Sequence, residues 1–193
     1  MLIKMLPKDD RVHLLELASL LSISDKPLLW DGKPYEEITA ENSLDQISIR
    51  VGEEENELID ELRRSADLSC ADELRFFTND DMLSRISERL VKLLKNSPLV
   101  KMADPGTRVW AGTTVLLEML AGKKYDLPST PKIILYELFL VSLRDGHISG
   151  IEWALLKEFQ RFYNLEDFIF DDLLGRAETL NKEITKTIAI ILE

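Results

Sequence analysis

Hydrophobic residues recur every three or four positions along most of the chain, and this spacing predicts amphipathic α-helices. About seven segments either carry this pattern or are apolar over a helical length. They are residues 7–21, 53–66, 72–95, 105–121, 130–143, 149–163 and 165–193. We therefore expect an all-α fold, a compact multi-helix domain of about seven helices.

The stretch Thr130–Tyr163 is central to this pattern, because it contains the most continuously apolar helical segment of the chain. From Ile133 to Leu143, only Glu137 and Ser142 interrupt the hydrophobic residues. A helix that is apolar on nearly every side belongs in the middle of a helical domain. A polar Arg-Asp-Gly-His turn follows, and a second, amphipathic helix comes after it.

Residues 25–52 differ from the rest of the chain, because helical periodicity is absent there. Pro27, Pro34 and the Asp31-Gly32 pair are turn signals. Hydrophobic and polar residues then alternate, which is typical of a short strand, at Ile47, Ile49 and Val51. We expect a loop-rich insertion, packed on the helical body, with room for a short β-hairpin.

The whole chain, residues 1–193, has the length of a single helical domain. A weak internal similarity relates Asn79–Arg85 to Phe170–Arg176, each with Asp-Asp near its start. It favours two related halves, residues 1–97 and residues 130–193. A connector and a helix at residues 98–129 join them. Repeated use of acidic helix starts would produce the same similarity by chance.

The net charge of −11 argues against nucleic-acid binding, because an acidic chain repels phosphates. A single cysteine, Cys70, excludes an internal disulfide and suits a reducing compartment. The first residues lack the apolar segment of a secretory signal, and no run is long enough for an integral membrane span. We therefore expect a cytoplasmic protein.

The polar turn invites a metal-site interpretation, because Asp145, Gly146 and Glu152 match the second half of a calcium-binding EF-hand loop. With Gly146 at the loop's glycine position, Val141 and Leu143 occupy the first and third ligand positions, and neither can bind calcium. A structural explanation is also complete. Ser149-x-x-Glu152 is a capping box that starts a helix, and Gly146 supplies the backbone freedom that ends the helix before it. Capping is therefore favoured over a complete local metal site.

A divalent cation, calcium or magnesium, could still lie between helices. Its candidate ligands are Asp145 and Glu152, with help from Asp171, Asp172 or Asp31. Two distant histidines do not make a zinc site, and the sequence motifs of metalloproteases, hydrolases and phosphate loops are absent. We nominate no catalytic residue and no residue for an organic cofactor.

A helix that ends in Asp145-Gly146, followed by Ile148-Ser149-x-x-Glu152 and an amphipathic helix, resembles the TerB-like (tellurite-resistance protein B-like) family. The segment Pro7–Leu21 is similar to the family's opening helix. The resemblance implies an all-helical domain associated with bacterial stress, tellurite or phage-defence systems. It also implies an acidic surface that binds divalent cations and no enzymatic activity. Asp145 and Glu152 are the positions to test.

Three hypotheses follow. The first is a non-enzymatic, TerB-like cytoplasmic protein that acts through its acidic surface, by protein interaction or by weak divalent-cation binding. The second is a metal-dependent enzyme whose carboxylates meet between helices. The third is a phage or plasmid adaptor that forms a homodimer through the C-terminal helix, residues 165–193, whose apolar stripe could instead bind another protein.

Overall fold

The computed structural model describes residues 2–68 and 79–192, and this part of the chain forms seven α-helices. They are α1 (Lys8–Ser24), α2 (Glu53–Ser65), α3 (Asn79–Leu94), α4 (Pro105–Ala121), α5 (Thr130–Ser142), α6 (Gly150–Phe162) and α7 (Asp167–Leu192). The expected all-α fold is confirmed. Cys70 and the first part of the helix expected over residues 72–95 lie outside the described residues.

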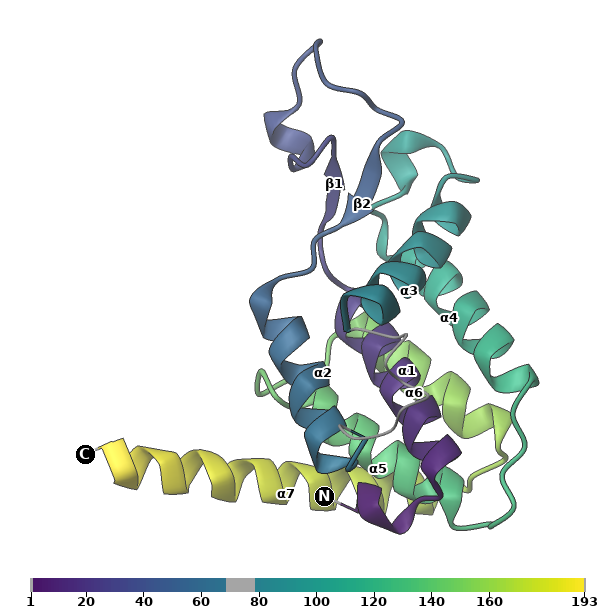
Figure 1. Cartoon of the computed structure of the whole chain (residues 1–193), viewed down its shortest axis with the longest axis vertical. Helices are drawn as coiled ribbons and strands as arrows, with labels where there is room; N and C mark the ends of the chain where they lie inside the picture. The colour runs from purple at the N-terminus through teal and green to yellow at the C-terminus, as the bar shows by residue number, and fades with distance from the viewer. Residues whose placement is uncertain (1, 69–78, 193) are drawn as a thin grey trace.

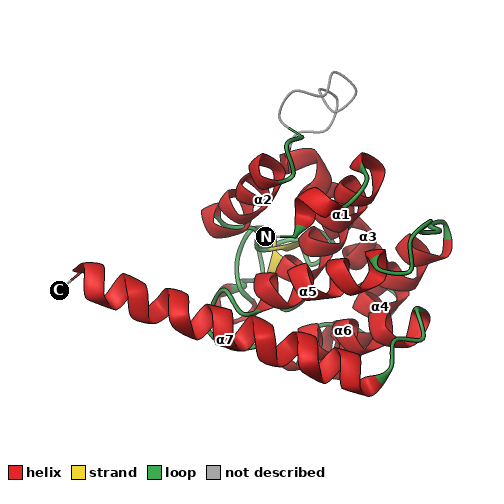
Figure 2. Ribbon diagram, turned by 90° about the horizontal axis from the view of Figure 1, so that it is seen from below, coloured by secondary structure: helices red, strands yellow, loops and turns green. Residues whose placement is uncertain are grey.

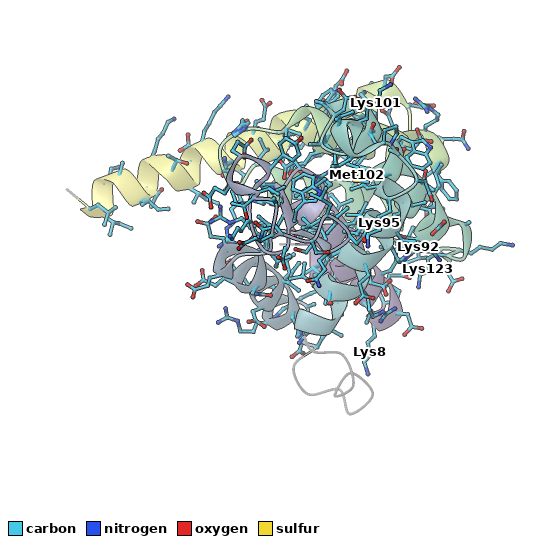
Figure 3. The ribbon with its side chains drawn as sticks, turned by 90° about the horizontal axis from the view of Figure 1, so that it is seen from above. Lys8, Lys92, Lys95, Lys101, Met102 and Lys123 are labelled. Carbon is cyan, nitrogen blue, oxygen red and sulfur yellow. The ribbon has the colours of Figure 1, made fainter. Side chains whose placement is uncertain are left out.

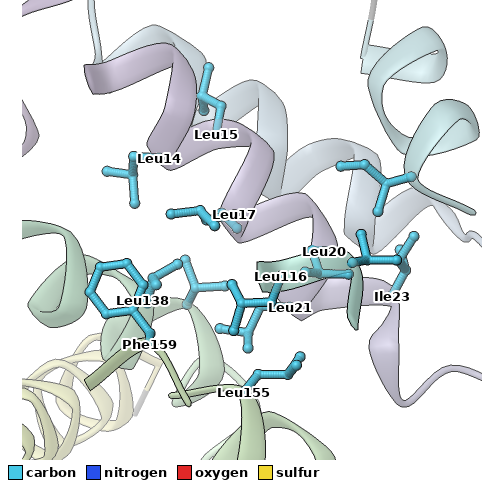
Figure 4. Packing of buried hydrophobic residues seen from close by; sticks show 14 of the residues in the cluster. Leu14, Leu15, Leu17, Leu20, Leu21, Ile23, Leu116, Leu138, Leu155 and Phe159 are labelled. Carbon is cyan, nitrogen blue, oxygen red and sulfur yellow. The ribbon is translucent and has the colours of Figure 1, made fainter. Parts of the chain in front are cut away.

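Helices α1 and α5 pack against each other at the centre of the fold (Figure 1). Helix α3 packs on α1, α7 packs on α5, and α4 packs on both α6 and α1. Figure 4 shows the core between them, where Leu17 and Leu20 of α1 approach Leu138 of α5, Leu155 and Phe159. The continuously apolar segment therefore lies in the interior, as its composition predicts.

Helix α1 is longer than the sequence predicts, because it continues through three residues that were expected to end it. The hydroxyl of Ser22 donates to the carbonyl of Ser19 at 3.1 Å, and that of Ser24 donates to the carbonyl of Leu21 at 2.9 Å. These bonds back to the preceding turn satisfy the buried hydroxyls within the helix. Helix α1 therefore ends at Ser24, and Asp25 is its C-cap.

The insertion forms a small antiparallel sheet, as expected, and lies at one end of the molecule (Figure 1). Strand β1 (Leu28–Trp30) pairs with β2 (Ile47–Ile49). The amino group of Lys95, the residue just after α3, donates to the carbonyl of Asp45 at 2.8 Å; Figure 3 labels Lys95. Trp30 is buried in the core. Its packing and the hydrogen bond from Lys95 hold the insertion on the helical body.

Helix α7 begins on the body and ends away from it (Figure 2). Phe170 and Ala177 in its first half are buried, whereas its last turns expose Ile184, Ile188 and Ile191. Among the described residues, no helix combines the length and the apolar character that crossing a membrane requires.

Candidate binding cleft

The turn between α5 and α6 adopts the capped geometry that the sequence predicts. Gly146 has a φ of 85°, a left-handed conformation that glycine adopts readily. The backbone N–H of Glu152 donates to the Ser149 hydroxyl at 3.3 Å, and the Ser149 N–H donates to the Glu152 carboxylate at 2.8 Å. This reciprocal pair is a capping box, and it fixes the Glu152 carboxylate at the start of α6.

A similar arrangement starts α2, and the sequence pattern did not predict it. The backbone N–H of Gly52 donates to the Glu55 carboxylate at 2.7 Å. Glycine has no side-chain oxygen, so only the glutamate half of a capping box forms here. Glu55 is therefore a buried, fixed carboxylate, although its position in a run of glutamates is typical of a solvated helix start.

These two helix starts meet at one cleft of about 370 Å³. Its walls carry more acidic than basic side chains, with Asp25, Glu54, Glu55, Glu57, Asp145 and Glu152 against Lys26 and Arg144. The residues come from the ends of α1 and α5, the start of α2 and the start of α6. The cleft therefore combines parts of the chain that are far apart in the sequence.

The structure brings together the two principal predicted ligands, because Asp145 and Glu152 both line this cleft. The proposed helpers do not line it: Asp171 and Asp172 are exposed on α7, and Asp31 lies in the insertion. Within residues 2–68 and 79–192, no group of three or more His, Cys, Asp or Glu side chains is arranged to hold a metal ion. Cation binding by Asp145 and Glu152 stays a prediction.

Glu152 lies where its negative charge is unfavourable, since only 9 % of the residue is exposed. Burial raises the pKa of its carboxyl above the ordinary value. The negative charge of Asp25 raises the pKa further, whereas hydrogen bonds from Ser149 and the nearby hydroxyl of Ser142 lower it. Asp25 and Glu152 both line the cleft, so the end of α1 lies close to the start of α6 there.

Lys26 neutralises the other buried carboxylate, because its Nζ lies 2.8 Å from Oε1 of Glu55. Burial raises the pKa of Glu55, but the hydrogen bonds from Lys26 and Gly52 outweigh burial and leave the pKa lowered. The bond to Glu55 raises the pKa of Lys26, and the charges of Asp25 and Asp145 raise it further. Lys26 is therefore held as an ammonium ion among carboxylates from both sides of the cleft.

Ser142 adds a buried polar group to the cleft wall. It is only 4 % exposed, and its hydroxyl makes no hydrogen bond of regular geometry in the described part of the chain, although it lies close enough to Glu152 to lower the pKa of that carboxyl. A buried polar group without a well-formed hydrogen bond is unfavourable, so this hydroxyl has capacity for a ligand or a water molecule.

Arg108 of α4 holds the end of α1 in place through hydrogen bonds. Its guanidinium donates to the backbone carbonyls of Ile23 and Ser24, which are among the last carbonyls of that helix. Burial lowers the pKa of Arg108, and the nearby charge of Asp25 raises it. Arg108 thus positions the segment that carries Asp25 and Lys26, a role that no local sequence signal indicates.

Comparison of this chain with models of protein families, with characterised proteins and with solved structures found no match. Membership of the TerB-like family rests on the short motif around Asp145 and on the helical pattern, and it stays a prediction.

Proposed function

We propose that this protein is a non-enzymatic, TerB-like binding protein that holds a positively charged ligand in its acidic cleft. The observation that supports the proposal is the convergence of two helix pairs that are distant in the sequence. Asp145 and Glu152 line the same cleft as Asp25 and Glu55. An excess of carboxylates attracts cations and basic groups, and partly buried walls strengthen this attraction relative to an open surface.

A hydrated divalent cation is one ligand of this class. Mg²⁺ is commonly held by one or two carboxylates and keeps several of its waters, so Asp145 and Glu152 suffice for weak binding. Ca²⁺ takes roughly six to eight oxygen ligands. The pair of carboxylates therefore favours magnesium over calcium.

Thermal melting with Mg²⁺, Ca²⁺ or Mn²⁺ tests the cation form of the proposal. A ligand present at a hundred times its Kd stabilises the folded state by about 2.7 kcal/mol, so millimolar Mg²⁺ raises the Tm of the wild type. The double variant D145N/E152Q loses this rise. The matched control D171N/D172N removes two exposed carboxylates outside the cleft and keeps it. An equal rise in all three proteins would mean that the ions act elsewhere.

The proposal also includes a biological role in bacterial stress responses. A TerB-like protein of this kind acts in the cytoplasm in bacterial tellurite or phage-defence responses. The support is the Asp145-Gly146 turn with its capped helix and the seven-helix fold. Survival on tellurite of a sensitive bacterium that expresses the wild type, compared with one that expresses D145N/E152Q, tests this role. Protection that does not depend on the cleft would separate the role from the site.

A second candidate function is protein interaction through α7, and the exposure of its apolar residues favours it. The three- and four-residue spacing that buries Phe170 and Ala177 continues at Leu180, Ile184 and Ile191. Ile184 is 48 % exposed and Ile191 is 74 % exposed. A helix with such a stripe pairs with another helix, and a second copy of α7 offers a complementary stripe.

The mass of the protein in solution tests the homodimer. The wild type is expected to form a dimer by light scattering, and I184D/I188D is expected to be a monomer, because each charge would be buried in the helix pair. The control K182D/T185D places the same charges on two other exposed positions of α7 and keeps the dimer. A monomeric wild type would exclude the homodimer at the concentrations measured.

A further inference from the structure

The cleft is made from two equivalent units. In each unit a helix carries a serine in its last turns and an aspartate three residues later. The next helix has a glutamate as its third residue. The first unit, α1 and α2, places Ser22, Asp25 and Glu55 in this way. The second unit, α5 and α6, has Ser142, Asp145 and Glu152 at the same places. All six residues line the cleft.

The packing of the helices and the burial of these residues follow the same equivalence. Helix α1 lies against α5, α3 packs on α1, and α7 packs on α5 (Figure 1). Both serines and both glutamates are buried, and both aspartates are exposed. In both units the glutamate accepts a hydrogen bond from the backbone N–H just before its helix.

The two units differ at the residue after the aspartate. The first unit has Lys26, whose ammonium binds Glu55 at 2.8 Å. The second unit has Gly146, and in the described part of the chain no basic side chain forms a salt bridge with Asp145 or Glu152. One buried glutamate therefore has a cation within the chain, and its equivalent lacks one.

The serines of the two units also differ in their hydrogen bonds. The hydroxyl of Ser22 donates to the carbonyl of Ser19, whereas in the described part of the chain the hydroxyl of Ser142 makes no hydrogen bond of regular geometry and lies beside the Glu152 carboxylate. Its oxygen can accept one N–H of a group that lies beside Glu152. The unit without a lysine is thus also the unit whose serine has no regular hydrogen bond.

We propose that Asp145, Glu152 and Ser142 form a receptor for a primary ammonium group, the lysine side chain of a basic partner segment. Lys26 already fills the equivalent place in the first unit. This inference rests on the proposed function of the cleft and specifies its ligand. An ammonium is a compact charge with three donors, and it can use two carboxylates and one hydroxyl. A bare metal ion is disfavoured, because no set of three metal-binding side chains is present in the described residues.

Calorimetric titration with a short glycine–lysine peptide tests the receptor, with the same peptide acetylated on its lysines as control. Acetylation removes the charge and abolishes binding. The variant D145N/E152Q weakens binding of the free peptide about tenfold or more, because charged hydrogen bonds are lost. D171N/D172N leaves this binding within about twofold, since both residues are exposed on α7 and do not line the cleft. Equal binding of both peptides, or unchanged binding by D145N/E152Q, would overturn the receptor.

The variant K26M provides a second test, because it empties the first unit. We expect one peptide amine to bind the wild type and two to bind K26M, with folding of K26M checked by circular dichroism. If K26M does not fold, K26Q takes its place. An unchanged stoichiometry in the folded variant would overturn the equivalence of the units. Binding of Mg²⁺ at Asp145 and Glu152 without binding of the peptide would overturn the ammonium receptor and leave the proposed function intact. Binding of neither would contradict both.

Discussion

Lys26 Nζ lies 2.8 Å from Oε1 of Glu55, and this ion pair joins the two ends of the insertion. The residues between them form β1 and β2, so the pair closes the insertion onto the helical body beside the cleft. Glu55 is buried and Lys26 is half-buried.

Replacement of Lys26 by methionine is expected to destabilise the protein by about 1–3 kcal/mol at pH 7, because it leaves a buried carboxylate without its cation. The pKa of Glu55 is lowered in the folded state. The stabilisation is therefore present above the unfolded pKa of about 4.5 and is lost as the pH falls through the lower folded pKa. Urea denaturation of wild type and K26M at several pH values measures it. A difference that does not shrink toward acid pH would contradict the role of this pair.

Glu152 should respond to pH in the opposite sense, because its folded pKa is raised. A carboxyl of this kind stabilises the fold at low pH, and the stabilisation is lost as the pH rises through its folded pKa. The E152Q variant keeps an oxygen that accepts from Ser149 but carries no charge. It is expected to be at least as stable as the wild type at pH 7.

The matched variant E152A removes the capping box as well as the charge. Its free energy of unfolding should be about 0.5–2 kcal/mol lower than that of the wild type. Urea denaturation of the three proteins at neutral pH separates the two contributions of the side chain. If E152Q were as unstable as E152A, the charge of Glu152 rather than its capping geometry would hold the start of α6.

His13 gives a separate prediction for acid stability. Burial lowers its pKa from 6.5 to about 4, and the charge of Lys123 lowers it further, while Asp10 opposes the shift. The folded state thus binds fewer protons than the unfolded state, and stability falls as the pH drops from 6.5 through 4. Protonation of His13 lowers the free energy of unfolding by about 3 kcal/mol over this range, and the H13L variant should not show this decrease. Parallel pH dependences in the two proteins would assign the acid sensitivity to other groups.

Arg108 is expected to be essential to the end of α1. The variant R108M leaves the carbonyls of Ile23 and Ser24 without their donor and should destabilise the protein by about 2–4 kcal/mol. R108K keeps a charge but cannot reproduce the planar guanidinium, so an intermediate stability is expected. Urea denaturation measures both. A stability of R108M close to that of the wild type would mean that Asp25 is positioned by other contacts.

The sequence predicted the features that depend on neighbouring residues. Helical periodicity located the helices, and the capping box at Ser149 and Glu152 follows from their spacing alone. The small sheet follows from the turn residues and the alternation in residues 25–52. The helices and the cap depend on nearby residues, and the sheet pairs two strands within one insertion, Leu28–Trp30 and Ile47–Ile49, so these features are largely local.

The cleft itself could not be predicted, because it depends on how distant helices pack. The insertion separates Asp25 from Glu55, and this hides their equivalence to Asp145 and Glu152. Asp171 and Asp172 were candidates by composition, but burial of Phe170 turns them outward on α7. The position of a residue on a packed helix decides its role, and the local sequence shows only the type of residue.

Two-dimensional NMR titration of the protein with Mg²⁺ and with the glycine–lysine peptide shows whether the acidic cleft binds a positively charged ligand through Asp145 and Glu152. We expect the amide shifts to concentrate at Ser142–Glu152 and around Asp25, and to disappear in D145N/E152Q. Shifts that lie on other surfaces, or that persist unchanged in the double variant, would contradict binding in this cleft.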